Sequence, residues 1–247
     1  MPRSNPAECS VLRITSLPDL TNHLNLSGPP STPRPSATVL LVRGRRPWEL
    51  LLVHRPGGAD FAPGAYVFPG GTVHADDMGE GDEIRMAAVR ELFEESGLLL
   101  ARRGRVFARR EECDRVRSIV EGGRSFNEAL RELRLEPALD RLTLFARWVT
   151  PAQMRRRFDA RFFLARLPAG QDVRAQEGEV TDWVWISPEL ALASPDITLV
   201  YATRAVLESV AGGVDAATLF ARARHQKEVP IVEPRIVQTE AGWEIVR

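Results

Sequence analysis

The sequence predicts an α+β fold, and three features of the chain support this prediction. Two apolar runs, at 37–42 and 48–54, have the length and composition of buried strands. Acids and apolar residues then interleave up to Gly97 in a pattern typical of a helix packed on one side. A third apolar run, at 142–149, has the composition of another strand. Strands that precede and follow a helix in this way predict a sheet and helices that share one core.

The composition is that of an ordinary globular protein. The chain has 247 residues, 44% of them hydrophobic, and a formal net charge of zero. Balanced charge argues against general affinity for nucleic acids, and no apolar run is long enough to span a membrane. The start of the chain lacks the apolar core of a signal peptide, and Cys9 and Cys113 show no metal or redox spacing. We therefore expect reduced thiols and a cytoplasmic location.

Residues 1–35 predict an irregular leader, because four prolines within 27–36 exclude regular structure there. The runs at 37–42 and 48–54 predict a hairpin. The turn between them contains Arg43, Arg45 and Arg46. Two interpretations of these arginines stay open, namely solvated side chains or contacts to a phosphate.

The predicted helix carries a cluster of carboxylates. Glu91, Glu94 and Glu95 stand at i, i+3 and i+4, so they share one helical face. Arg90 lies four residues before Glu94, close enough to pair with it. Crowded carboxylates repel one another unless cations neutralise them, and Mg²⁺ or Mn²⁺ prefers oxygen ligands. The pattern predicts a metal site at the three glutamates, and the alternative is a solvated charged face.

The flanking residues favour the metal site. Val89, Leu92 and Phe93 place apolar side chains between the acids, so one side of the helix is expected to be buried. The chain enters the helix from Gly70-Gly71, where backbone N–H groups can approach an anion closely.

The segment RELFEESGL, from Arg90 to Leu98, resembles the second half of the Nudix box, G-x5-E-x7-R-E-U-x-E-E-x-G-U, in which U is aliphatic. All fixed positions of that half are met. In the first half, the acid eight residues before Arg90 is Asp82 instead of Glu, and ten residues instead of five separate it from Gly71. We therefore expect an insertion at about 74–80.

This resemblance implies an α/β/α sandwich around a mixed sheet and a hydrolase that uses Mg²⁺ or Mn²⁺. It also implies that Glu91, Glu94 and Glu95 bind the metal and that Arg90 orients their carboxylates. The reaction implied is attack of water on a phosphorus of a diphosphate.

A second resemblance lies upstream of the helix. Residues 51–71 are similar to the coenzyme A diphosphatase signature, L-L-T-x-R-[SA]-x3-R-x3-G-x3-F-P-G-G. The matching positions are Leu51, Leu52, Arg55, Gly64, Phe68, Pro69, Gly70 and Gly71. Asp60 stands where the signature has its second arginine, which reverses a charge at an expected phosphate contact. The substrate contacts implied are Arg55, Gly64, Phe68, Gly70 and Gly71, and the hairpin turn adds Arg43.

The segments WVTP and RRFDARFFLA, within 145–167, resemble the peroxisomal acyl-CoA diphosphatase branch of this family, which also lengthens the first half of the box. The substrate implied is coenzyme A or an acyl-CoA, cut to adenosine 3′,5′-bisphosphate and (acyl-)phosphopantetheine. One alternative is a different small nucleotide, such as ADP-ribose or a dinucleotide. Another is a non-catalytic module that senses a nucleotide, which the intact acidic triad disfavours.

The segment 102–141 predicts a helical insert within the Nudix domain, which we place at 36–193. Its helices are expected at 111–121 and 125–133, and Ser125 with Glu128 forms a capping box at the start of the second. Acids and bases alternate along the insert, which predicts a solvated lid or a contact within a homodimer.

Strands are predicted at 161–165 and 180–186, and the loop between them contains Glu177 and Glu179. The resemblance implies a carboxylate here that faces the metal and acts as the base. Glu179 is preferred and Glu177 is the reserve, with a solvated loop acid as the alternative. Residues 194–247 are a predicted C-terminal extension, with helices at 198–210 and 215–224 and an extended segment at 229–246.

Overall fold

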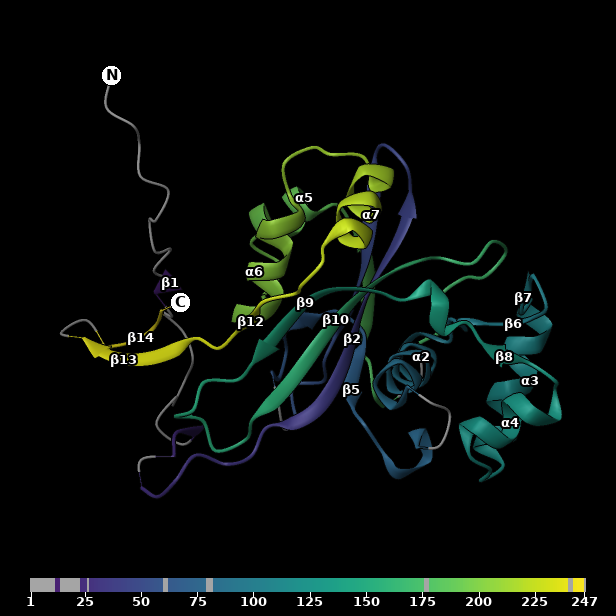
Figure 1. Cartoon of the computed structure of the whole chain (residues 1–247), viewed down its shortest axis with the longest axis horizontal. Coiled ribbons are helices and arrows are strands. Elements are labelled where there is room, and N and C mark those ends of the chain that lie inside the picture. Colours follow the sequence, from purple (N-terminus) through teal and green to yellow (C-terminus); the bar gives the residue numbers. More distant parts are fainter. Residues whose placement is uncertain are drawn as a thin grey trace.

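A mixed eight-stranded sheet forms the centre of the molecule, which is a computed structural model (Figure 1). The structure describes residues 12–13, 23–25, 27–59, 62–78, 82–175, 178–239 and 242–246. The strand order is β11-β3-β2-β10-β9-β12, with β4 against β3 and β5 against β2. Their bounds are β2 Arg34–Gly44, β3 Trp48–His54, β4 Tyr66–Val67, β5 Gly70–Thr72, β9 Thr143–Val149, β10 Phe158–Arg166, β11 Asp182–Ile186 and β12 Ile231–Val232.

Helices cover both faces of this sheet, so the predicted α/β/α sandwich is confirmed (Figure 1). Side chains alternate between the two faces of a strand. On β2, Val39 and Leu41 therefore join one core, and Leu40 and Val42 join the other. The first core packs under α2, and the second under α5, α6 and α7. These helices span Glu83–Ser96 (α2), Pro188–Ala193 (α5), Tyr201–Val210 (α6) and Ala216–His225 (α7).

Strand β3 pairs with only part of β2, and the glycine pair lies beside another part of the same strand. Strand β2 pairs with β3 near its carboxyl end and with β5 near its start, where Thr38 lies opposite Gly70. A Cβ at Gly70 would collide with the backbone of Ala37 and Thr38. Only glycine allows the chain to cross β2 so closely before it turns toward α2.

The helical insert packs on the core, so the prediction of a solvated lid is wrong for its inner face. Helices α3 (Arg110–Glu121) and α4 (Phe126–Glu132) lie beside a small sheet of β6 (Ala101–Arg103), β7 (Val106–Phe107) and β8 (Glu136–Pro137). The predicted Ser125–Glu128 capping box is present. Val116, Phe126 and Leu130 belong to the same core as α2, and the rings of Phe126 and Phe93 lie 5.5 Å apart.

The leader is more ordered than the prolines predict. Strand β2 begins at Arg34, and Leu24 is buried. Pro35 lies within this strand, and its carbonyl accepts a hydrogen bond from the Val73 N–H at 3.0 Å. A separate three-stranded sheet joins the two ends of the chain (Figure 1). Its strands are β1 (Leu12–Arg13), β14 (Gly242–Val246) and β13 (Arg235–Thr239).

The remaining elements agree with the expected positions, although β10 begins at Phe158 instead of at residue 161. The two-residue strand β12 lies at the edge of the main sheet, as its flanking Pro230 and Pro234 predict. None of the helices in the described ranges has the length and hydropathy that a membrane crossing requires.

Candidate active site

Helix α2 is fixed at both ends and along its buried side. The Asp82 carboxylate accepts a hydrogen bond from the Arg85 N–H at 3.1 Å and caps the first turn. Gly97 has φ 72°, and its N–H donates to the Phe93 carbonyl at 2.7 Å, which confirms the predicted C′ glycine. With Leu92 and Phe93 buried in the core, the acids of α2 are held toward the loop that contains Gly70.

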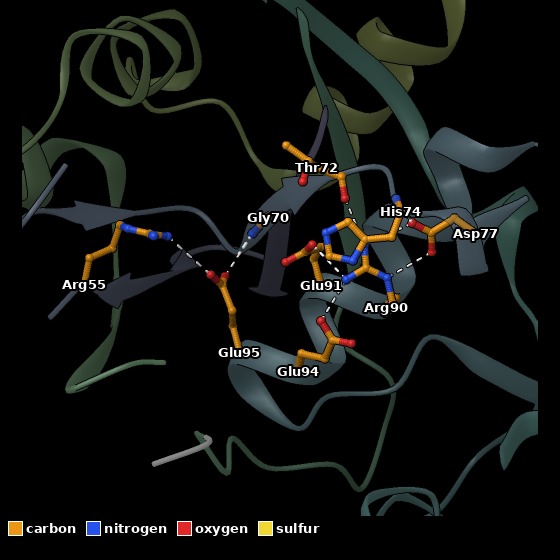
Figure 2. A network of polar contacts seen from close by, with 9 residues as sticks. All are labelled: Arg55, Gly70, Thr72, His74, Asp77, Arg90, Glu91, Glu94 and Glu95. Carbon is orange, nitrogen blue, oxygen red and sulfur yellow. Dashed lines mark hydrogen bonds and ion pairs between the residues drawn. The ribbon is translucent and has the colours of Figure 1, made fainter. Parts of the chain in front are cut away.

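Arg90 joins two of the three predicted metal ligands (Figure 2). Its Nη1 donates to Glu91 Oε1 and to Glu94 Oε2, both at 2.8 Å. Its Nη2 donates to the Thr72 carbonyl at 2.9 Å. Arg90 is only 3% exposed, so these contacts hold the two carboxylates in one arrangement. Burial lowers the pKa of Arg90, but its hydrogen bonds to Asp77 and the charges of the nearby acids raise it well above its usual value.

The acid that pairs with Arg90 from the loop is Asp77, and the assignment of that position to Asp82 is wrong. Asp77 Oδ1 and Oδ2 each lie 3.0 Å from a guanidinium nitrogen, and Oδ2 also accepts the His74 N–H at 2.8 Å (Figure 2). Asp77 is 1% exposed. Five residues separate Gly71 from Asp77, as in the Nudix box. The extra residues therefore follow Asp77 instead of occupying 74–80, and counting forward from Gly71 would have found it.

Glu95 turns away from the other two glutamates. Its Oε2 accepts the Gly70 N–H at 2.9 Å, and its Oε1 lies 3.6 Å from Arg55 Nη1 (Figure 2). Burial raises the pKa of Glu95 to about 8, although the Gly70 N–H and the Arg55 charge act in the opposite direction. Glu95 therefore links the glycine loop, Arg55 and α2.

Glu179 lies close enough to α2 for its charge to act on all three glutamates. Burial raises the pKa of Glu91 and of Glu94, Arg90 opposes this rise, and the Glu179 charge adds to it. The same charge also contributes to the raised pKa of Glu95. Of the two loop acids proposed for the base, Glu179 is therefore within electrostatic range of the cluster, and Glu177 lies outside the described residues.

Gly71 allows Glu91 to lie directly against the loop. A Cβ at Gly71 would overlap the Glu91 carboxylate. Each glycine of the pair is therefore required by a different contact. Gly70 lies against the backbone of β2, and Gly71 lies against the Glu91 carboxylate of α2.

Two of the other predicted substrate contacts, Phe68 and Arg43, lie apart from the acids, and a third, Gly64, lies in a turn. Phe68 is buried in the second core, with its ring 6.4 Å from that of Phe162. Arg43 is five residues beyond Thr38 along β2, which is about 16 Å at the usual rise of a strand. It pairs with Glu49 at 2.6 Å and lies over the Trp185 ring. Gly64 has φ 66° in the turn before β4, and Asp60 lies outside the described residues.

The donor set fits a hard divalent cation only in part. Within the described ranges, no three His, Cys, Asp or Glu side chains are arranged to hold a metal ion. The reason is geometric, because Arg90 lies between Glu91 and Glu94 while Glu95 is bound to Gly70. Mg²⁺, however, is typically held by one or two carboxylates and completes its shell with water and substrate phosphates. Glu91 and Glu94, with Glu179 nearby, supply oxygen donors of that kind.

Comparisons with known proteins agree with the fold and the motif. The family model of the NUDT19 Nudix domain matches residues 81–199. A Caenorhabditis elegans protein whose name assigns it to the nudix hydrolases (nudix hydrolase 7) is 32% identical over 155 residues, which are 62% of this chain and 52% of that protein. The Xenopus laevis acyl-coenzyme A diphosphatase NUDT19 is 26% identical over 205 residues, which cover 59% of this chain and 54% of that protein.

The chain spans about half the length of the curated relatives that it matches. Among solved structures, a NUDIX hydrolase from Alicyclobacillus acidocaldarius is similar, with a TM-score of 0.65 and 26% identity, over 77% of this chain and 96% of that one. The sandwich fold, the Arg90-centred carboxylates and these similarities together identify the Nudix fold in this chain and a match to the NUDT19 Nudix domain over residues 81–199.

Proposed function

We propose that this chain is a metal-dependent diphosphatase that cleaves coenzyme A or an acyl-CoA to adenosine 3′,5′-bisphosphate and (acyl-)phosphopantetheine. The observation that carries the proposal is the buried Arg90 guanidinium, which binds Glu91 and Glu94 beside the glycine loop. The substrate class is supported by the similarity to an acyl-coenzyme A diphosphatase and by the spacing of residues 51–71.

Glu91 and Glu94 are the residues that would hold Mg²⁺ or Mn²⁺, with Glu95 completing the acidic cluster from the side of the glycine loop. A divalent cation at such a site neutralises phosphate oxygens and lowers the pKa of bound water. Arg90 keeps Glu91 and Glu94 at fixed positions, so these carboxylates need little reorganisation when the substrate arrives.

The hydrolytic step needs a base for the attacking water. Glu179 would accept a proton from this water, whose oxygen forms a bond to one phosphorus of the diphosphate. The bridging P–O bond breaks, and its electron pair leaves with the other phosphate. The charge of Glu179 acts on all three glutamates of α2, which supports this role.

Arg55 is the best-placed residue for contact with a substrate phosphate. It follows β3 directly, and its guanidinium lies 3.6 Å from Glu95, at the border between the glycine loop and the acids. An arginine fork can bind phosphate oxygens at two points. Arg43 is a weaker candidate, because it is paired with Glu49 on the distant hairpin.

A substrate panel tests this function against a different small nucleotide. The specificity constant kcat/KM is measured with Mg²⁺ for coenzyme A, an acyl-CoA, 3′-dephospho-coenzyme A, ADP-ribose and a dinucleoside polyphosphate, and products are identified by mass spectrometry. We expect coenzyme A or the acyl-CoA to give the highest value. Preference for ADP-ribose or for the dephospho form would assign the protein to a different nucleotide substrate, and absence of any hydrolysis would favour a nucleotide-sensing module.

A further inference from the structure

The helical insert contacts the loop that holds Arg90. Asn127, the second residue of α4, donates a hydrogen bond from Nδ2 to the backbone carbonyl of Asp76. Asn127 is 9% exposed and Asp76 is exposed, so this bond is partly buried. The residue that follows Asp76 is Asp77, whose carboxylate binds Arg90 at two points.

The contacted loop has little packing of its own. Asp77 is buried, whereas His74, Ala75, Asp76 and Met78 around it are exposed. The single 3₁₀ turn η1 (Ala75–Asp77) is closed by two backbone hydrogen bonds, of 3.1 and 3.2 Å. A short, exposed turn of this kind is expected to open easily unless contacts from other elements hold it.

Helix α4 can hold this turn because it is itself fixed on α2. The Phe126 ring packs against Phe93 with a centroid distance of 5.5 Å, and Asn127 is the next residue. A closed path of contacts therefore leads from Phe93 of α2 through α4 and Asp76 to Asp77, and back to Arg90 of α2. Both ends of the path lie on the helix that carries the glutamates.

We propose that Asn127 is a positioning residue for the carboxylate cluster. By holding the Asp76 carbonyl, Asn127 keeps Asp77 against Arg90, and Arg90 in turn keeps Glu91 and Glu94 in one fixed arrangement. The proposal rests on the proposed function for the identity of the cation. It assigns a role to the insert, because the insert then supports the active site through the loop that contains Asp77.

The test measures Mn²⁺ binding to the full chain by electron paramagnetic resonance, without substrate. Asn127→Ala removes the donor, and we expect Mn²⁺ to bind about 10-fold more weakly, the lower end for loss of a direct partner of a metal ligand, because Asn127 acts through Asp77 and Arg90. Asn127→Asp, which keeps the size but has no N–H to donate, should behave in the same way and guards against a packing defect of the alanine variant.

The control is Ser125→Ala, which removes the cap of the same helix without touching Asp76. This variant should bind Mn²⁺ like the wild type. Hydrogen exchange in the metal-free protein gives a second readout, with faster exchange of the amides at 74–78 expected in both Asn127 variants.

Wild-type Mn²⁺ affinity in both Asn127 variants would overturn the proposal, as would equal weakening by Ser125→Ala. Because these readouts need no turnover, they are separate from the proposed function. If the Mn²⁺ affinity depends on Asn127 but the chain does not cleave coenzyme A, the positioning role stands and the proposed substrate is wrong.

Discussion

Arg90 and Asp77 form a two-point ion pair between helix α2 and the loop before it. Nε lies 3.0 Å from Oδ1, and Nη2 lies 3.0 Å from Oδ2. The two side chains are 3% and 1% exposed. Because neither charge can regain water when the other is lost, the pair determines both the stability of the loop and the position of the cluster.

Asp77→Asn should therefore lower the free energy of unfolding by about 3 kcal/mol, the lower end for a broken buried pair, since Glu91 and Glu94 still face Arg90. Hydrolysis should fall as well. The matched control is Asp82→Asn, because asparagine caps a helix as well as aspartate does, and its unfolding free energy should stay within about 1 kcal/mol of wild type. Urea unfolding gives both values. A larger loss for Asp82→Asn than for Asp77→Asn would return the role to Asp82.

Gly71→Ala should reduce kcat while the fold is retained. The new Cβ would overlap the Glu91 carboxylate, so Glu91 must swing away from its present position. A displacement of about 1 Å in an active site can cost about 10²-fold in rate. Gly57→Ala is the control, because a Cβ there meets no atom within 4 Å, and its kcat should be unchanged. Equal kcat for the two variants would show that the close approach of Gly71 has no functional role.

Glu179→Gln should lower kcat by about 10²–10⁴-fold, the usual contribution of a general base, with little change in KM. The change keeps the shape of the side chain and removes the charge that acts on the α2 glutamates. Steady-state kinetics with coenzyme A measures both parameters. If Glu177→Gln is the damaging change instead, the base is Glu177, and if neither variant is impaired, the base lies on α2.

The contribution of Glu95 to the stability of the metal-free protein should fall as pH rises from about 5 to about 8. Burial raises the pKa of Glu95 to about 8, whereas a glutamate in an unfolded chain titrates near about 4.3. Between these values the folded state binds the proton and the unfolded state does not, so each rise in pH favours unfolding.

Glu95→Gln removes this titration but keeps an acceptor for the Gly70 N–H. Its free energy of unfolding, measured with urea in the absence of metal, should therefore vary less with pH between 5 and 8 than that of the wild type. Identical pH dependence in the two proteins would show that Glu95 has an ordinary pKa.

Features set by local sequence could be predicted. Helix α2, its end at Gly97 and the capping box at Ser125 depend on residues within a turn or two of one another. The pairing of Arg90 with Glu94 follows from their i, i+4 spacing, whereas the contact of Arg90 with the adjacent Glu91 does not follow from helical spacing.

Features set by distant contacts could not be predicted. The packing of the insert depends on Phe126 meeting Phe93, and the order of the leader depends on β1 pairing with β14 at the other end of the chain. The role of Asp77 was missed because of the insertion. The usual spacing counted back from Arg90 selects Asp82, whereas the usual spacing counted forward from Gly71 selects Asp77. Only the folded loop shows which acid reaches Arg90.

The most direct test of the central claim is the Mg²⁺-dependent release of adenosine 3′,5′-bisphosphate from coenzyme A, compared between wild type and Glu94→Gln. Exposed Glu128→Gln serves as the control acid on α4. We expect release by the wild type that stops when Mg²⁺ is chelated, and a turnover about 10²–10³-fold lower in Glu94→Gln at saturating Mg²⁺, as is typical when one stabilising contact of the transition state is lost. Turnover of Glu94→Gln close to that of the wild type would contradict the claim that this carboxylate cluster is the active centre.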